Sequence, residues 1–119
     1  MSLNESVYEG YMPIITALQD KHGFDIEFID LRDVSGFADA FIIATARSEI
    51  NARTLREAAE DALDTLGLSY KVEGENSAKW SLIDAGDIVI HIFSRDGREF
   101  YRLERLWGDA PSARFESED

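Results

Sequence analysis

The sequence predicts an α/β (α+β) fold, a single domain in which a mixed five-stranded sheet is packed with helices in the order α-β-β-α-β-β-β-α. The chain has 119 residues, the size of one domain, and 45% of them are apolar, which is enough for a hydrophobic core. Short runs rich in strand-forming residues alternate with stretches that have the apolar spacing of amphipathic helices. We find no internal repeat and no interdomain linker.

The first part of the domain is predicted to be a helix followed by two strands. The helix spans residues 12–21, because Pro13 suits a first helical turn and Gly23 suits a helix end. Residues 25–31 are expected to form the first strand. Residues 40–46 (AFIIATA) are an apolar run of strand length, which predicts a buried strand.

The next segment is predicted to be a long amphipathic helix. Ser48 is a suitable N-cap and Gly67 a suitable end. Apolar residues recur at helical spacing: Leu55, Ala58, Ala59, Ala62, Leu63 and Leu66. Charged residues fill the opposite face, so one side should pack on the sheet and the other should face water.

Three strands and a last helix are expected in the remainder. The strands span residues 69–72, 80–84 and 87–94, and Ala85-Gly86 joins the last two as a hairpin-like turn. The helix spans residues 98–107. We therefore expect a flexible N-terminus at 1–10, a folded domain at 11–108 and an acidic flexible tail at 109–119.

The chain is strongly acidic. It has 24 Asp and Glu against 12 Lys and Arg, a formal net charge of -12. Such a surface repels phosphate backbones, so we expect no direct sequence-specific binding of nucleic acid and favour a basic protein as partner. The absence of cysteine fits the reducing cytoplasm. The longest uncharged stretch, residues 10–19, is far shorter than the roughly twenty residues of a membrane-spanning helix, so we expect no membrane partner.

Signatures of catalysis are missing from the sequence. It has no cysteine, no HExxH or CxxC motif, no GxSxG elbow and no Gly-rich phosphate loop. We therefore expect no enzyme, no cofactor and no metal. Asp84 and Asp87 flank a turn, where an aspartate is more often a turn residue than a catalytic base.

The strand around His91 has two different faces. Ile88, Ile90 and Ile92 share one face, which should pack beneath helices. His91 and its neighbours share the other, which we expect to be partly open. A lone histidine there indicates a structural or partner contact more than catalysis.

Residues 73–107 (EGENSAKWSLIDAGDIVIHIFSRDGREFYRLERLW) closely resemble the ribosomal silencing factor (Iojap) family. The matching positions are Glu73, Gly74, Trp80, Asp84, His91, Phe93, Arg98, Phe100, Tyr101, Leu103, Glu104, Leu106 and Trp107. Upstream, Asp30 and the segment from Ala38 to Ile43 also match. The chain departs from the family at Ala40, Ala46 and Asn51, around the second strand and the start of the long helix.

The resemblance implies a nucleotidyltransferase-like sheet without the enzymes' active site, because the Gly-Ser and the closely spaced aspartate pair are absent here. It implies binding to the fourteenth protein of the large ribosomal subunit at the intersubunit face. That binding would block subunit association and repress translation under nutrient limitation. It also implies a possible homodimer. Two alternatives stay open: a divergent nucleotidyltransferase-like enzyme and an acidic adaptor for another basic protein.

Aromatic and acidic residues of the second half are the expected contacts, because binding hot spots favour Trp and Tyr and because carboxylates would pair with a basic partner. We expect Phe100 and Leu103 to be mostly core. The predicted partner-binding residues are Asp39, Trp80, Asp84, His91, Phe93, Tyr101, Glu104 and Trp107.

Overall fold

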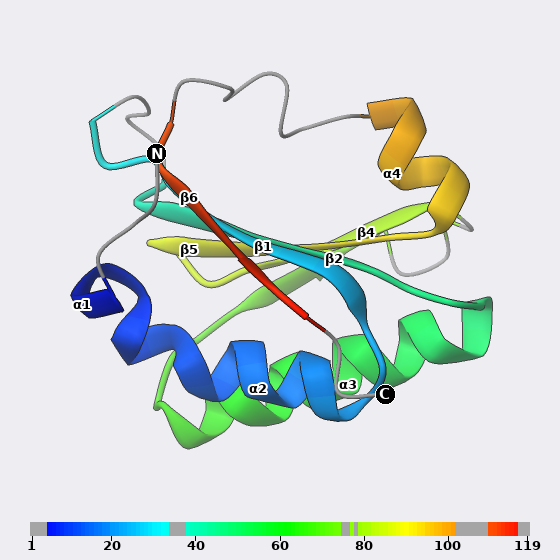
Figure 1. The fold of residues 1–119 in the computed structure, drawn as a ribbon. Helices are drawn as coiled ribbons and strands as arrows, with labels where there is room; N and C mark the ends of the chain where they lie inside the picture. Colours follow the sequence, from blue (N-terminus) through cyan, green and yellow to red (C-terminus); the bar gives the residue numbers. More distant parts are fainter. Residues whose placement is uncertain (1–4, 34–37, 75–76, 78, 102–109, 117–119) are drawn as a thin grey trace.

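Six strands form one mixed sheet in the order β3-β4-β5-β2-β1-β6 (Figure 1). The computed structural model describes residues 5–33, 38–74, 77, 79–101 and 110–116. The strands are β1 (Phe24–Asp30), β2 (Ala40–Thr45), β3 (Lys71–Glu73), β4 (Trp80–Asp84), β5 (Ile88–Phe93) and β6 (Ser112–Phe115). All neighbouring pairs are antiparallel except β2 and β5, which run parallel at the centre of the sheet.

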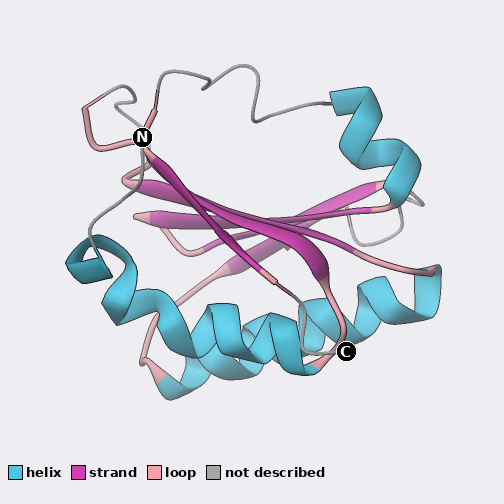
Figure 2. Ribbon diagram, in the orientation of Figure 1, coloured by secondary structure: helices cyan, strands magenta, loops and turns pink. Residues whose placement is uncertain are grey.

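The described helices are unequally divided between the two faces of this sheet (Figure 2). They are α1 (Glu5–Tyr8), the 3-10 helix η1 (Glu9–Tyr11), α2 (Met12–Asp20), α3 (Glu49–Thr65) and α4 (Arg95–Tyr101). Helices α2 and α3 lie side by side against one face, whereas α4 lies on the opposite side at one end of the sheet. We call the face beneath α2 and α3 the helix-covered face and the other the α4 face.

The main core lies between the sheet and α2 and α3. Its fully buried members include Ile14 and Leu18 of α2, Leu55 and Leu63 of α3, and Ile90 of the central strand β5. The predicted packing of Ile88, Ile90 and Ile92 beneath helices is confirmed, since all three belong to this cluster. Burial of apolar surface on this scale provides the main stabilisation of the fold.

Local signals fix the ends of the two long helices as predicted. Pro13 lies in the first turn of α2, where no backbone donor is lost. Ser48 caps α3, because its hydroxyl accepts a hydrogen bond from the Asn51 backbone N–H at 3.0 Å. Gly67, with a φ of 76°, allows the Leu68 N–H to reach the Leu63 carbonyl at 2.9 Å and so closes α3.

Two predicted boundaries shift for reasons that the hydrogen bonds explain. The capping bond at Leu68 extends the helix end, so β3 begins at Lys71 and not at residue 69. Helix α4 begins at Arg95 and not at residue 98, because the Ser94 hydroxyl accepts from the Gly97 N–H at 2.9 Å and caps it. Residues 102–107 of the predicted last helix lie outside the described residues.

The sheet has six strands and not the expected five, and parts of the two segments that were expected to be flexible form regular secondary structure. Residues 112–115 form β6, which pairs with β1 from Ile26↔Phe115 to Ile29↔Ser112 and adds a sixth strand. The free edge of β1 offers backbone groups that this segment satisfies. At the other end, residues 5–11 are helical, and Tyr8 packs its ring against Phe28 and Phe115 at 5.9 and 5.1 Å.

Candidate functional site

A second, smaller cluster of side chains occupies the α4 face. Its buried members are Ile29, Leu31, Ala38, Phe41, Ile43, Val89 and Phe93, with Trp80, Leu82 and Ala110 packed at its margin. His91 lies among them, with its ring centroid 4.5 Å from Phe41 and 6.0 Å from Phe93. In this cluster, aromatic side chains therefore surround one titratable group, the imidazole of His91.

Trp80 and His91 form the polar contact of the cluster. The Trp80 indole Nε1–H donates to His91 Nδ1 at 3.2 Å, and the two rings stack with centroids 6.3 Å apart. Trp80 is half-buried, so part of its indole reaches the surface. The hydrogen bond fixes the direction of this indole.

His91 is neutral in this environment. Burial lowers the pKa of His91 from 6.5 to about 4. Because Nδ1 accepts from Trp80, the imidazole proton resides on Nε2, which is buried and has no hydrogen-bond partner among the described residues. In this neutral form the His91 ring packs within the cluster and accepts the hydrogen bond that orients Trp80.

The start of β4 is held by a glycine. Gly74 has a φ of 74°, and a Cβ built there would lie 2.8 Å from the Trp80 carbonyl oxygen. Only a residue without a side chain fits so close to β4 in this conformation. Gly74 of the Glu73-Gly74 pair therefore allows the chain to leave β3 in close contact with the backbone of Trp80.

The side chains of β4 alternate between the two faces. Ser81 and Ile83 are buried toward the helix-covered face, whereas Trp80 and Leu82 are half-buried and Asp84 is exposed on the α4 face. We call Trp80, Leu82 and Asp84 the β4 stripe. Leu82 was not among the residues singled out in the sequence, although its two-residue spacing places it on the same strand face as Trp80 and Asp84.

Carboxylates gather at the end of the sheet where β2 and β5 begin. Asp39 and Asp84 are exposed, as is Asp87, whose carbonyl accepts from the Asp39 N–H at 2.8 Å. Asp84 Oδ1 accepts from the Gly86 N–H at 2.9 Å in the β4–β5 turn. Burial raises the pKa of Tyr11, and the carboxylates of Asp39 and Asp87 raise it further. This effect of the two carboxylates is expected where the electrostatic potential is negative.

A buried arginine ties α4 to the sheet. Arg98 Nη1 donates to the Asp25 carbonyl at 2.7 Å and to Thr45 Oγ1 at 2.9 Å. Its Nη2 lies 4.0 Å from Glu27 Oε1, which also lies 3.3 Å from Arg114 Nε of β6. Arg98 was among the matching positions of the sequence, but nothing in the sequence predicted that Glu27 would be buried. A carboxylate on a strand is expected to face water unless a buried cation is known to lie beside it.

The predicted contact residues fall into three groups. Asp39, Asp84 and Trp80 reach the surface, and the structure brings Trp80 and Asp84 together on one strand face. His91 and Phe93 are buried and not partly open, with 5% and 1% of their surface exposed. Tyr101 ends α4 and only its backbone is described, whereas Glu104 and Trp107 lie outside the described residues.

Within the described part of the chain, no group of three or more His, Asp and Glu side chains could hold a metal ion. The described helices are all too short or too polar to cross a membrane. On the α4 face, the half-buried Trp80 lies over a buried aromatic cluster and beside exposed carboxylates.

Comparison with known proteins identifies the family of this chain. Residues 5–119 match the profile of the family described as "Ribosomal silencing factor during starvation". The chain belongs to the ribosomal silencing factor family. The ribosomal silencing factor RsfS of Bacillus subtilis is 40% identical over 98 residues, covering 82% of this chain and 83% of that protein. The RsfS of Halalkalibacterium halodurans is 35% identical and covers 86% and 88%.

Solved structures support the family fold. A crystal structure of a Chromobacterium violaceum protein superposes with a TM-score of 0.80 at 32% identity, covering 86% of each chain. One from Bacillus halodurans gives 0.76 at 29% identity, covering 90% of this chain and 98% of that one. The predicted mixed sheet packed with helices is therefore confirmed.

Asn51, one of the positions that depart from the family pattern, has a clear local role. Its Oδ1 accepts from the Arg47 N–H at 2.8 Å, and its Nδ2 donates to the Lys21 carbonyl at 2.8 Å. This side chain thereby joins the end of α2 to the start of α3. Ala40 and Ala46 are both 2% exposed and belong to the main core.

Proposed function

We propose that this ribosomal silencing factor binds the fourteenth protein of the large ribosomal subunit at the intersubunit face. Bound there, it blocks docking of the small subunit and represses translation under nutrient limitation. Membership of the family, whose relatives are named silencing factors, is the observation that carries this proposal. The site of action is the cytoplasm, where ribosomes work.

Inhibition by occlusion needs no reaction, only a rigid surface with sufficient affinity. A standard interface buries roughly 800 Å² on each partner and depends on a few central aromatic side chains. The β4 stripe offers a half-buried indole, an apolar neighbour and an exposed carboxylate in one row. The hydrogen bond from Trp80 to His91 holds the indole in place before binding, which lowers the entropic cost of association.

The acidic end of the sheet complements this surface. Asp39 and Asp84 are exposed and can approach lysine or arginine side chains of a basic ribosomal protein. We place these carboxylates at the rim of the interface and Trp80 at its centre. Under this proposal the protein is not an enzyme, because none of its contacts requires a covalent or proton-transfer step.

Co-sedimentation with purified ribosomal subunits tests the proposal. We expect saturable binding to the large subunit, none to the small subunit and reduced formation of complete ribosomes. Trp80→Ala should weaken binding to the large subunit about thirtyfold or more, the effect of losing a hot-spot aromatic. Tyr8→Ala, which removes a half-buried ring from the N-terminal helix, is the matched control and should bind normally. Equal binding to both subunits, or to neither, would overturn the proposal.

Self-association is a second part of the proposal. We propose that the free protein forms a homodimer, as the family resemblance implies. Light scattering of the purified full chain measures its mass directly. A concentration-independent monomer mass would contradict this part without affecting binding to the large subunit.

A further inference from the structure

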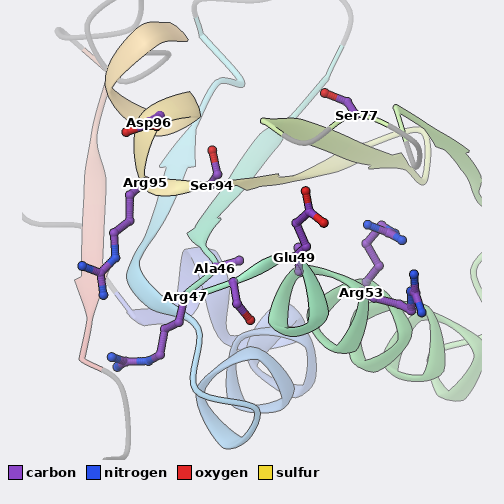
Figure 3. A pocket seen from close by; sticks show the side chains of 11 residues that line it. Ala46, Arg47, Glu49, Arg53, Ser77, Ser94, Arg95 and Asp96 are labelled. Carbon is purple, nitrogen blue, oxygen red and sulfur yellow. The ribbon is translucent and has the colours of Figure 1, made fainter.

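A cleft lies at the end of the sheet where the parallel strands β2 and β5 finish (Figure 3). Its volume is about 540 Å³, within the range of small-molecule sites. The lining comes from the start of α3, the start of α4 and the loop before β4: Ala46, Arg47, Ser48, Glu49, Ala52, Arg53, Arg56, Ser77, Ser94, Arg95 and Asp96. None of these residues belongs to the β4 stripe.

The chain topology makes this end of the sheet a natural binding position. The neighbouring strands β2 and β5 run parallel, and each is followed directly by a helix. Helix α3 turns to one face of the sheet and α4 to the other (Figure 1). A crevice forms at the carboxyl ends of parallel strands where successive connections leave on opposite faces, and ligands of open α/β sheets bind in such crevices.

The described lining of the cleft is basic, whereas the molecule is acidic. Among the described lining residues four are arginines and two carry carboxylates, although the chain has a net charge of -12. Among the described residues, the side chains of Arg53 and Arg56 form no hydrogen bond or salt bridge, although Arg56 interacts electrostatically with Glu60 of the same helix. In Figure 3, Glu49 lies between Arg53 on one side and Arg47 and Arg95 on the other, and the side chains of Arg47 and Arg95 extend away from it. A local group of guanidinium groups in a cleft creates a positive potential that raises the local concentration of anions.

The walls of the cleft are held firmly. Arg47 Nε donates to the His22 carbonyl at 2.9 Å, and the guanidinium groups of Arg47 and Arg95 lie 5.0 and 5.2 Å from the centre of the Phe24 ring. On the α4 side, the Ser94 N–H donates to the Lys79 carbonyl at 3.0 Å. Any side chain at Gly97 would collide with that same carbonyl, so α4 is fixed closely against the start of β4.

We propose that this cleft binds a phosphorylated small molecule of nucleotide size, with two or more phosphate groups. Guanidinium groups bind phosphate in a bidentate manner, and two separated arginine pairs suit two phosphates. No aromatic side chain is among the described lining residues, so recognition rests on the phosphates and discriminates weakly between bases. Glu49 opposes the ligand and limits its affinity, which suits a reversible signal more than a permanent cofactor.

Calorimetric titration of the full chain with inorganic pyrophosphate, adenosine diphosphate and guanosine diphosphate tests this site. We expect saturable binding of all three. Arg53→Gln should weaken binding about tenfold, the effect of losing one charge-assisted hydrogen bond, whereas Glu49→Gln should strengthen it. Lys71→Gln is the control, because it removes one positive charge from the exposed start of β3 at the other end of β4.

Three results would overturn the proposal. They are absence of saturable binding, an equal loss with Arg53→Gln and Lys71→Gln, and tighter binding of a short single-stranded RNA than of pyrophosphate at the same arginines. The last result would identify nucleic-acid backbone as the occupant. Thermal melts of each variant separate a loss of binding from a loss of folding. None of these outcomes depends on whether the protein binds ribosomes.

Discussion

His91 shows how one residue can link folding to the candidate binding surface. It is 5% exposed, and its Nδ1 atom receives the hydrogen bond that positions the half-buried Trp80. Protonation would place a charge in an apolar cluster and remove this acceptor. The neutral ring therefore supports both the stability of the α4 face and the orientation of the indole.

This coupling predicts a pH dependence of stability. The folded-state pKa of about 4 lies below the ordinary 6.5, so the stabilisation is present above pH 6.5 and is lost as the pH falls toward 4. Between about pH 7 and about pH 5, the free energy of unfolding should fall by about 2 kcal/mol more in the wild type than in His91→Gln. Urea unfolding at both pH values measures this, and His22→Asn, which changes an exposed histidine, should behave like wild type.

Gly74 and Gly86 illustrate two different reasons why a position requires glycine: backbone conformation and lack of space for a Cβ. Both have positive φ values, 74° and 85°, but a Cβ would meet the Trp80 carbonyl only at Gly74, and nothing within 4 Å at Gly86. We predict that Gly86→Ala costs about 1–2 kcal/mol from backbone strain. Gly74→Ala should cost clearly more and should also weaken partner binding, because it displaces Trp80. Chemical denaturation of both variants gives the comparison; equal losses would show that the close approach at Gly74 is unimportant.

Among the elements, α4 and β6 depend on contacts that are distant in sequence. Arg98 of α4 bonds backbone and side-chain oxygens of Asp25 and Thr45, and Glu27 stands between Arg98 and Arg114 of β6. Three elements thus meet at one group of charges on the α4 face, in which Arg98 and Glu27 are buried and Arg114 is exposed. Removing Arg98 leaves the buried Glu27 carboxylate with only the exposed Arg114 as a charged partner among these residues, which is costly for a buried charge.

We predict that Arg98→Met lowers the free energy of unfolding by about 3 kcal/mol, within the range for breaking a buried charge pair. Arg32→Met is the matched control. Arg32 binds Asp30 with two short side-chain hydrogen bonds, but its side chain is 55% exposed, so its loss should lower stability clearly less than loss of Arg98 does. Thermal and urea unfolding of the two variants measure the difference. Similar losses of unfolding free energy in the two variants would mean that burial of Arg98 does not increase its contribution to stability.

The elements also show which parts of the fold were predictable from sequence. The bounds of β4 agree with the prediction, because Trp80–Asp84 is a short, mostly apolar run that ends at the Ala85-Gly86 turn. Helix α3 was predictable from its apolar spacing and its Ser48 cap. Strand β6 was not, because its four residues have little pattern of their own and become a strand only beside the edge of β1.

The candidate site was predictable only in part, for a similar reason. Trp80 and Asp84 follow from local pattern and residue type, but the burial of His91 and Phe93 depends on how distant segments pack over β5. The arginine cleft could not be foreseen at all. Its lining residues are spread between positions 46 and 96, and only the parallel pairing of β2 with β5 brings them together.

On the scale of the whole molecule, charge is divided between the two ends of the sheet. Asp39, Asp84 and Asp87 gather where β2 and β5 begin, and the arginine cleft lies where these strands end. The acidic end and the β4 stripe are continuous through Asp84. A basic partner would therefore be oriented toward this end before contact, while the arginine cleft faces away from it.

This division predicts that charge governs the rate of association and apolar contact governs the rate of dissociation. Salt screens exposed charges beyond about 8 Å at physiological ionic strength, so raising salt should slow association of the isolated large-subunit protein and change dissociation much less. Asp39→Asn should act like added salt, whereas Asp61→Asn, which neutralises an exposed carboxylate on α3, should have a smaller effect. Trp80→Ala should mainly speed dissociation, because it removes buried contact area.

Surface-plasmon resonance measurements across a salt series separate the association rate from the dissociation rate. If dissociation carries most of the salt dependence, the carboxylates are buried anchors and not steering groups, and Asp39 and Asp84 would then belong at the centre of the interface.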